Sequence, residues 1–163
     1  MTAAAATEAM IRFYAGRKHD ISHFLKVYSF AKTIGEMEKL DKDTQFTLEI
    51  AAIVHDIPCP LCREKYGHTD GKLQEKEGPA LAEAFLSSLG FDAALIRRVS
   101  WLVGHHHTYT DVDGLDHQIL LEADFLVNAD EHSLPASAIE QMRDTVFRTA
   151  SGKRLLSSIY LQA

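Results

Sequence analysis

Apolar residues recur at a helical spacing along most of this chain, and no stretch shows the alternation of a half-buried strand. In the first clear case, the positions that share one helix face after Asp20 are His23, Val27, Phe30, Ile34 and Met37. The next amphipathic stretch runs from about Asp43, its expected cap, to Asp56, and Pro58 stops the helix just beyond. The pattern therefore predicts two long helices in the first third of the chain.

The helical pattern resumes after a long polar segment. Residues 58–78 are rich in charged side chains and glycine, so they are predicted to form a loop with a short helical piece in it. Pro79 is expected in the first turn of the following helix, because proline is favoured there. Further helices are predicted over residues 80–89, 93–104 and 116–128, from residue 135, and near 151–161.

These elements predict an all-α fold, a single compact bundle of about seven or eight helices over residues 1–163. The length suits one domain with a sizeable core, and 46% hydrophobic and 25% charged residues are ordinary for a globular protein. The formal net charge of -6 gives no sign of a basic face for a nucleic-acid polymer.

No feature of the sequence indicates export or a membrane partner. The segment Met1–Glu8 has no basic residue, so it does not resemble a secretory signal. No uninterrupted apolar run approaches the roughly 18 residues of a membrane span. Cys59 and Cys62 lie close to prolines in the polar segment and are expected to be reduced thiols. We therefore expect a cytoplasmic protein, and the sequence leaves its oligomeric state open.

The apolar run 50–54 ends in an unusual pair, His55 and Asp56. Burying an imidazole and a carboxylate there is costly unless they are paired or bind a metal. The same dipeptide occurs at His19 and Asp20, where Asp20 precedes an amphipathic run and is expected to be a helix cap. The apolar context, rather than the dipeptide itself, makes the later pair a candidate metal site.

Two more polar residues lie on apolar helix faces. His23 alone could be a hydrogen-bonded core histidine. Asp124, inside the apolar run 119–127, could alone pair with Arg97 or Arg98. The combination of these two residues with the His-Asp pair is harder to explain by structural roles alone. Histidines and carboxylates together are typical metal ligands. The residues that fit one mononuclear site are His23, His55, Asp56 and Asp124.

In their order and setting, these residues resemble the HD-domain superfamily of metal-dependent phosphohydrolases. That family has a His in an early helix, a His-Asp pair at a helix end, and a later Asp after a small residue. The matching segments, within about residues 19–130, are Asp20-x-x-His23, Ala52-x-x-His55-Asp56 and Glu122-Ala123-Asp124. The resemblance implies hydrolysis of a phosphate ester or anhydride, with a nucleotide-like small molecule as the expected substrate.

Dinuclear members of the family have two further histidines between the His-Asp pair and the last Asp. The first of these positions falls on Glu77, and the second falls in the histidine run 105–107. The resemblance thus implies that Glu77 is a second-site ligand or a proton carrier. Helical phase continued from the preceding apolar positions favours His105 or His106 as the residue that faces the site.

The resemblance also implies how the residues around the ion would act. A divalent Mn, Fe, Co, Mg or Zn ion could bind, and the mixed His and carboxylate ligands favour a transition metal. The ion would activate water, which Asp56 or Asp124 would orient. Glu77 or His106 would carry protons.

Basic residues follow the His-Asp pair in the polar segment and could clamp a phosphate group. They are Arg63, Lys65, Lys72 and Lys76. Each of them could equally be a solvated surface residue.

Two other classes of function stay open at this stage. HD-type proteins include di-iron oxygenases, which need a complete dinuclear ligand set. Glu77 in place of a histidine weakens the hypothesis that this protein is such an oxygenase. A catalytically inert module that binds a small molecule is the other alternative, although such a module has no need of metal ligands.

Overall fold

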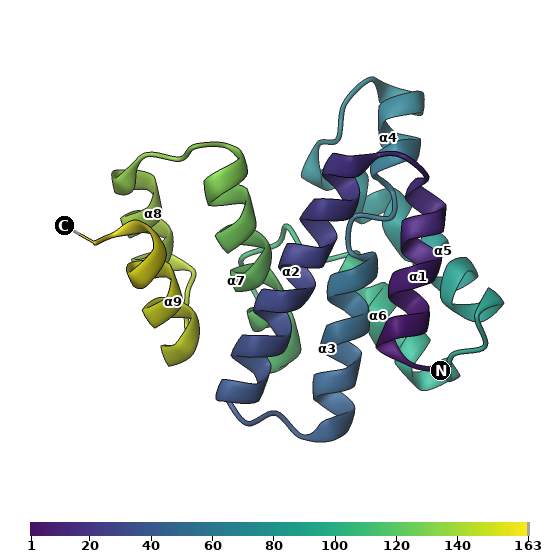
Figure 1. Ribbon diagram of the computed structural model, residues 1–163, viewed down its shortest axis with the longest axis horizontal. Helices are drawn as coiled ribbons and strands as arrows, with labels where there is room; N and C mark the ends of the chain where they lie inside the picture. Colours follow the sequence, from purple (N-terminus) through teal and green to yellow (C-terminus); the bar gives the residue numbers. More distant parts are fainter. Residues whose placement is uncertain (163) are drawn as a thin grey trace.

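The computed structural model describes residues 1–162, and these residues are helical with no strand (Figure 1). The all-α prediction is confirmed. The helices are α1 (Ala3–Tyr14), α2 (Lys18–Met37), α3 (Lys42–Val54), α4 (Cys59–Tyr66), α5 (Gly71–Ser88), α6 (Ala93–Val103), α7 (Gly114–Glu131), α8 (Ala136–Thr145) and α9 (Ala150–Tyr160). None of these helices is long and apolar enough to cross a membrane.

Side-chain caps fix where several helices begin. Asp92 accepts from the backbone of the first turn of α6, as the sequence predicts. For α3 the cap is Asp41 rather than Asp43, which lies in the first turn. Asp20 and Asp116 also lie in a first turn instead of capping, where their charge still favours the helix dipole. These three corrections move a helix start by only a few residues.

Helix α3 is the centre of the core and packs against α1, α2, α6 and α7. Its residues 48–54 are all buried, so this part of the helix has no face exposed to solvent. Helix α7 is also buried over most of its length and packs against α2 and α3. In Figure 1, α8 and α9 lie at one end of the molecule, and α4 and α5 lie toward the other. The site residues come from the middle, where α2, α3 and α7 meet.

Helix α1 was not assigned from the sequence pattern, yet it contributes to the core. Its buried residues Ala6, Met10 and Tyr14 recur every four positions and face α2 and α3. The hydroxyl of Tyr14 donates to the backbone carbonyl of Asp56 (2.7 Å). Helix α1 therefore braces the turn that carries one of the predicted metal ligands.

The polar segment 58–78 is more ordered than the sequence predicts. Helix α4 occupies its first part, and α5 already begins at Gly71, so Pro79 lies inside a helix rather than at its start. A Cβ atom on Gly78 would lie 2.5 Å from a methyl carbon of Val103. Only glycine therefore allows α5 to approach α6 this closely.

A buried carboxylate ties α7 to the start of α9. Glu122 is fully buried and accepts hydrogen bonds from the backbone amides of Arg148 (2.7 Å) and Thr149 (2.9 Å). The Thr149 hydroxyl and the Gln118 amide donate to it as well. Gly152 packs directly against this carboxylate, and an added Cβ atom would overlap with it.

We predict that Gly152→Ala lowers the free energy of unfolding by about 1–3 kcal/mol, because the carboxylate must give up buried hydrogen bonds to admit the methyl group. Thermal or denaturant unfolding followed by circular dichroism measures the change. Ser158→Ala, at an exposed position of the same helix, is the control and should unfold like the unmodified protein. Equal stability of all three proteins would contradict the prediction.

Candidate metal centre

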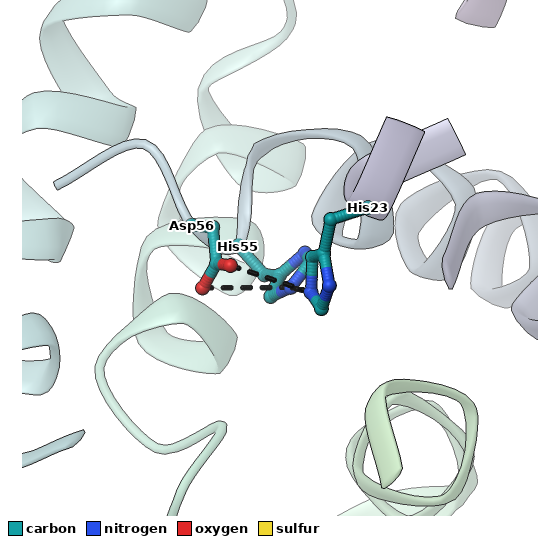
Figure 2. A group of neighbouring side chains, drawn as sticks. All are labelled: His23, His55 and Asp56. Carbon is teal, nitrogen blue, oxygen red and sulfur yellow. Dashed lines mark hydrogen bonds and ion pairs between the residues drawn. The ribbon is translucent and has the colours of Figure 1, made fainter. Parts of the chain in front are cut away.

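His23 reaches the centre of the site from the inner face of α2 (Figure 2). Its side chain is almost fully buried. Its Nε2 atom lies 3.2 Å from Nε2 of His55 and 3.1 Å from Oδ1 of Asp124. It also lies 3.3 Å from Oδ2 of Asp56. One imidazole nitrogen is therefore close to an atom of each of the other predicted ligands.

The His-Asp pair occupies the tight turn that follows α3. The helix ends at Val54, and in the turn beyond it Oδ1 of Asp56 lies 3.5 Å from Nε2 of His55. Nδ1 of His55 donates to the carbonyl oxygen of Ala52 (2.8 Å), which leaves the lone pair of Nε2 toward the site. The Asp56 side chain is 22% exposed, so it reaches from the buried ligands to the surface of the site.

Asp124 approaches from α7, where its neighbours along the chain, Ala123 and Phe125, are buried apolar residues. Its Oδ1 atom lies 3.5 Å from Nε2 of His55. The alternative partner Arg98 is engaged elsewhere, since its guanidinium donates to Asp113 and Asp116. The structure therefore places Asp124 with the two histidines and not in an arginine pair.

The four side chains fit a bound cation in both spacing and chemistry. A metal–ligand distance of about 2.1 Å places neighbouring ligand atoms about 3.0 Å apart in an octahedron and about 3.4 Å apart in a tetrahedron. The measured separations of His23 Nε2 from the other ligand atoms, 3.1–3.3 Å, lie in that range. The converging atoms are carboxylate oxygens and imidazole nitrogens, which repel one another unless a cation or a proton lies between them.

The pKa values show how strongly this place favours positive charge. Burial would lower the pKa of His23, but its hydrogen bond with Asp124 and the charge of Asp56 raise it to about 10. Burial would raise the pKa of Asp124, but hydrogen bonds with His23 and His55 hold it well below its usual range. In the metal-free protein a proton on His23 thus supplies the charge that a metal ion would supply.

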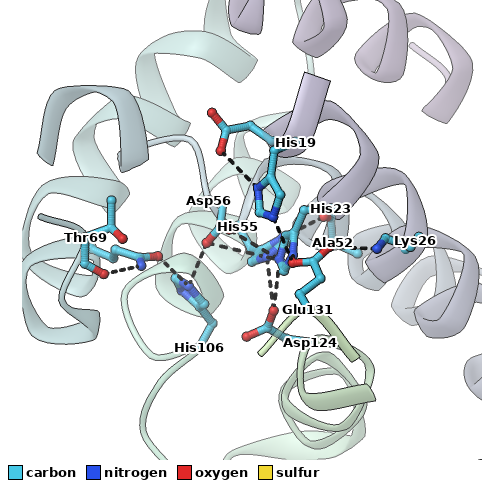
Figure 3. A network of polar contacts seen from close by, with 12 residues as sticks. His19, His23, Lys26, Ala52, His55, Asp56, Thr69, His106, Asp124 and Glu131 are labelled. Atoms are coloured by element: carbon cyan, nitrogen blue, oxygen red, sulfur yellow. Dashed lines mark hydrogen bonds and ion pairs between the residues drawn. The ribbon is translucent and has the colours of Figure 1, made fainter. Parts of the chain in front are cut away.

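Glu131 completes the support of His23 and was missed in the sequence. Its carboxylate accepts from Nδ1 of His23 (2.8 Å) and from Lys26 (2.7 Å) (Figure 3). A carboxylate behind a ligating histidine fixes the ring and its tautomer. The signal was present, because Glu131 follows Asp124 by two helical turns and therefore lies on the same face of α7.

The histidine run 105–107 divides into three environments. His105 stacks on Trp101, with ring centroids 4.0 Å apart, and its Nδ1 donates to the Trp101 carbonyl. His106 is fully buried, and its Nε2 lies 3.5 Å from Oδ1 of Asp56. His107 lines a cavity that opens beside the predicted ligands. The prediction was wrong for His105, because α6 ends at Val103 and helical phase cannot be continued past that residue.

Gln74, rather than Glu77, faces this second group of histidines. Its carboxamide donates to the carbonyl of Thr69 (2.8 Å), which turns Oε1 toward Nε2 of His106 and of His107, 3.2 Å from each. Gln74 reaches this position because α5 begins early and presents the residue one turn before Gly78. Sequence reasoning missed it by placing the helix start at Pro79.

Glu77 itself lies apart from the predicted ligands. Its carboxylate accepts from Lys65 (2.9 Å) and from the hydroxyl of Tyr66 (2.5 Å), and it pins α4 to α5. The expectation that Glu77 binds metal or carries protons is therefore corrected. A second three-ligand group is instead formed by Asp56, His106 and His107, whose ligand atoms lie within 4.8 Å of one another.

A cavity of about 440 Å³ opens beside the four predicted ligands. His23, Asp56 and Asp124 lie on its wall, so the ligand group is accessible from outside. Arg63 also lies on the wall, where its guanidinium donates to Asp20. The other basic candidates are not on that wall: Lys65 is paired with Glu77, and Lys72 and Lys76 are exposed on α5.

Comparison with known proteins agrees with this geometry. The family model for the HD domain matches residues 20–134. This chain belongs to the HD-domain family. A crystal structure of a "predicted HD superfamily hydrolase" from an uncultured Thermotogales bacterium is similar, with 28% sequence identity and a TM-score of 0.68. The similarity covers 96% of this chain and 84% of that chain. No curated protein matches.

The family membership inferred from the sequence is therefore confirmed. Both comparisons support a hydrolase, and a metal-dependent phosphohydrolase is what the HD family suggests.

We predict that His55→Ala and Asp124→Ala each remove most of the divalent transition metal that the purified HD domain binds. Changes outside the ligand shell already cost about 10–100-fold in metal affinity, so loss of a ligand should be at least as severe. Elemental analysis after dialysis gives the metal content of each variant. His105→Ala, which changes a histidine that faces Trp101 instead, should keep its metal. Full occupancy in both ligand variants would show that the site is assigned wrongly.

We predict that Glu131→Gln weakens metal binding by about 10–100-fold while the fold persists, because the amide holds the His23 ring less firmly than the carboxylate does. Titration with a competing chelator measures the affinity. Asp130→Asn, the exposed neighbour on the same helix, is the matched control. If the two variants bind metal equally well, Glu131 does not support the site.

Proposed function

We propose that this HD domain is a metal-dependent phosphohydrolase that cleaves a phosphate ester or anhydride of a small molecule. The observation that carries the proposal is that the ligand group lies on the wall of a cavity and is not sealed in the core. A structural metal site is closed by protein ligands, whereas a catalytic site keeps positions open for water and substrate. The accessible Asp56 marks the open side.

The ligands in this proposal are His23, His55, Asp56 and Asp124. A divalent ion bound there would supply Lewis acidity toward a phosphoryl oxygen and lower the pKa of water. Mn, Fe, Co, Mg and Zn all suit ligands of this kind, and mixed nitrogen and oxygen donors favour a transition metal.

Asp56 and His106 are the side chains that we assign to proton handling. The Asp56 carboxylate reaches the cavity wall and can accept a hydrogen bond from a water molecule there. Nε2 of His106 lies beside Oδ1 of that carboxylate. The other ring nitrogen of His106, Nδ1, donates to the Val103 carbonyl (2.7 Å). The ring therefore presents only Nε2 to Asp56, so a proton can be passed between the two side chains at that atom.

Arg63 is the basic residue that supports phosphate binding. It is the only arginine or lysine on the cavity wall within residues 1–162, and it projects from α4 toward Asp20 of α2. A phosphate in the cavity could accept from the guanidinium alongside Asp20, because a guanidinium carries five N–H donors. Lys72 and Lys76 are left out of this proposal, since both lie away from the cavity.

The two alternative functions, a di-iron oxygenase and an inert binding module, differ from phosphohydrolysis in what happens to the bound small molecule. A di-iron oxygenase would consume oxygen, and an inert binding module would return its ligand unchanged. The group of Asp56, His106 and His107 leaves room for a second ion, so the metal count belongs in the same experiment.

We predict that metal-free protein reloaded with Mn, Fe, Co, Mg or Zn releases phosphate, or a nucleoside monophosphate, from at least one compound in a broad panel. The panel should include phosphomonoesters, nucleotides and dinucleoside polyphosphates, because a nucleotide-like substrate is the sequence-based expectation. Asp56→Asn should reduce the rate by at least about 100-fold, as expected when a general acid–base group is lost. Tight binding of an unmodified ligand without turnover under every metal would favour the binding module instead.

A further inference from the structure

Nearly all the residues that line the cavity beside the ligands are of polar types. Helical spacing explains its walls, because α7 contributes Asp124 and Asn128 one turn apart, and α2 contributes His19 and His23 in the same way. Apart from Cys59, the lining residues carry charged, imidazole, amide or hydroxyl groups. No Phe, Tyr, Trp or branched aliphatic side chain lines the cavity in the part of the chain that the structure describes.

On the basis of the proposed function, we infer that the substrate is a compact phosphate ester rich in hydroxyl groups, a sugar or polyol phosphate, rather than a nucleotide. Most small-molecule pockets are apolar with a few polar groups, and bases are typically held by stacking on aromatic rings. A cavity of about 440 Å³ lined by hydrogen-bonding side chains without aromatic rings other than imidazoles suits a small molecule rich in hydroxyl groups.

The imidazole rings on the walls do not form a stacking site for a base. His23 is occupied by the other ligands, and the Nε2 atom of His107 lies 3.2 Å from the Gln74 carboxamide oxygen. His19 and His132 are mostly exposed and lie at the rim. A base inserted here would meet charged and amide groups instead of an apolar ring face.

Two neutral side chains on the walls are free to recognise hydroxyl groups. Asn128 lies one turn beyond Asp124, and Thr69 lies just before α5. Neither the Asn128 carboxamide nor the Thr69 hydroxyl has a hydrogen-bond partner among residues 1–162, although Thr69 accepts from Gln74 through its carbonyl. Both groups can donate and accept, as a substrate hydroxyl does.

Two carboxylates on the cavity wall, Asp20 and Glu131, are already paired with positive charges, which disfavours a substrate with an ammonium group. Asp20 accepts from Arg63, and Glu131 accepts from Lys26 and His23. Neither offers an unpaired negative charge to a cationic substrate. Uncharged hydroxyl groups therefore suit this part of the cavity better than an amine.

The experiment compares three probes under the metal that is bound best: methyl phosphate, glycerol phosphate or hexose phosphate, and a nucleoside monophosphate. Methyl phosphate reports the chemistry of the metal centre without hydroxyl recognition. We expect kcat/KM to be highest for the polyol or hexose ester. In Asn128→Leu and in Thr69→Val, the ratio of kcat/KM for that ester to kcat/KM for methyl phosphate should fall by about three- to tenfold, the usual effect of one lost hydrogen bond.

Asp130→Asn, on the solvent side of α7 beside Asn128, is the control and should keep the ratio of the unmodified protein. A nucleoside monophosphate cleaved better than the polyol esters, or an unchanged ratio in both wall variants, would overturn the inference while phosphohydrolysis stands. No phosphate release from any probe would count against the proposed function itself, and the inference would fall with it.

Discussion

Imidazole nitrogens and carboxylate oxygens from α2, α7 and the turn after α3 converge at the wall of one cavity, and positive charge is needed to hold them together. Uncompensated, such groups would each be costly to bury. The packing of α2, α3 and α7 against one another generates the convergence, because it brings His23, His55 and Asp124 to the same place. The core thus supplies the energy that holds a chemically unfavourable group together, and the cation relieves the repulsion.

Much of this arrangement could be predicted from the sequence. His23 and Asp124 stand out because each interrupts an apolar helix face, and a helix face is defined by local spacing alone. The pair His55 and Asp56 stands out because it ends an apolar run. The spatial assembly of these residues did not follow from spacing, and it was the resemblance to HD domains that joined them.

The errors at Gln74, Glu77 and His105 arise where a helix begins or ends. Gln74 was missed and Glu77 was chosen in its place, because the start of α5 was set at a proline and not at the cap Asp70. His105 was named as an alternative to His106 because helical phase was continued past the end of α6 at Val103. Helix ends depend on competing caps and on tertiary packing, such as the close approach at Gly78, and neither is visible in local periodicity.

The separation of the ligands along the chain affects how the folded protein opens and unfolds. His23 and Asp124 lie 101 positions apart, so an ion shared between them would close most of the chain into one loop. In this respect it would act as a removable cross-link, comparable to a disulfide that spans a long loop. Any route of unfolding that parts α2 from α7 would first have to release the ion. The rate of metal loss and the resistance to proteolysis would then be two measures of one opening event.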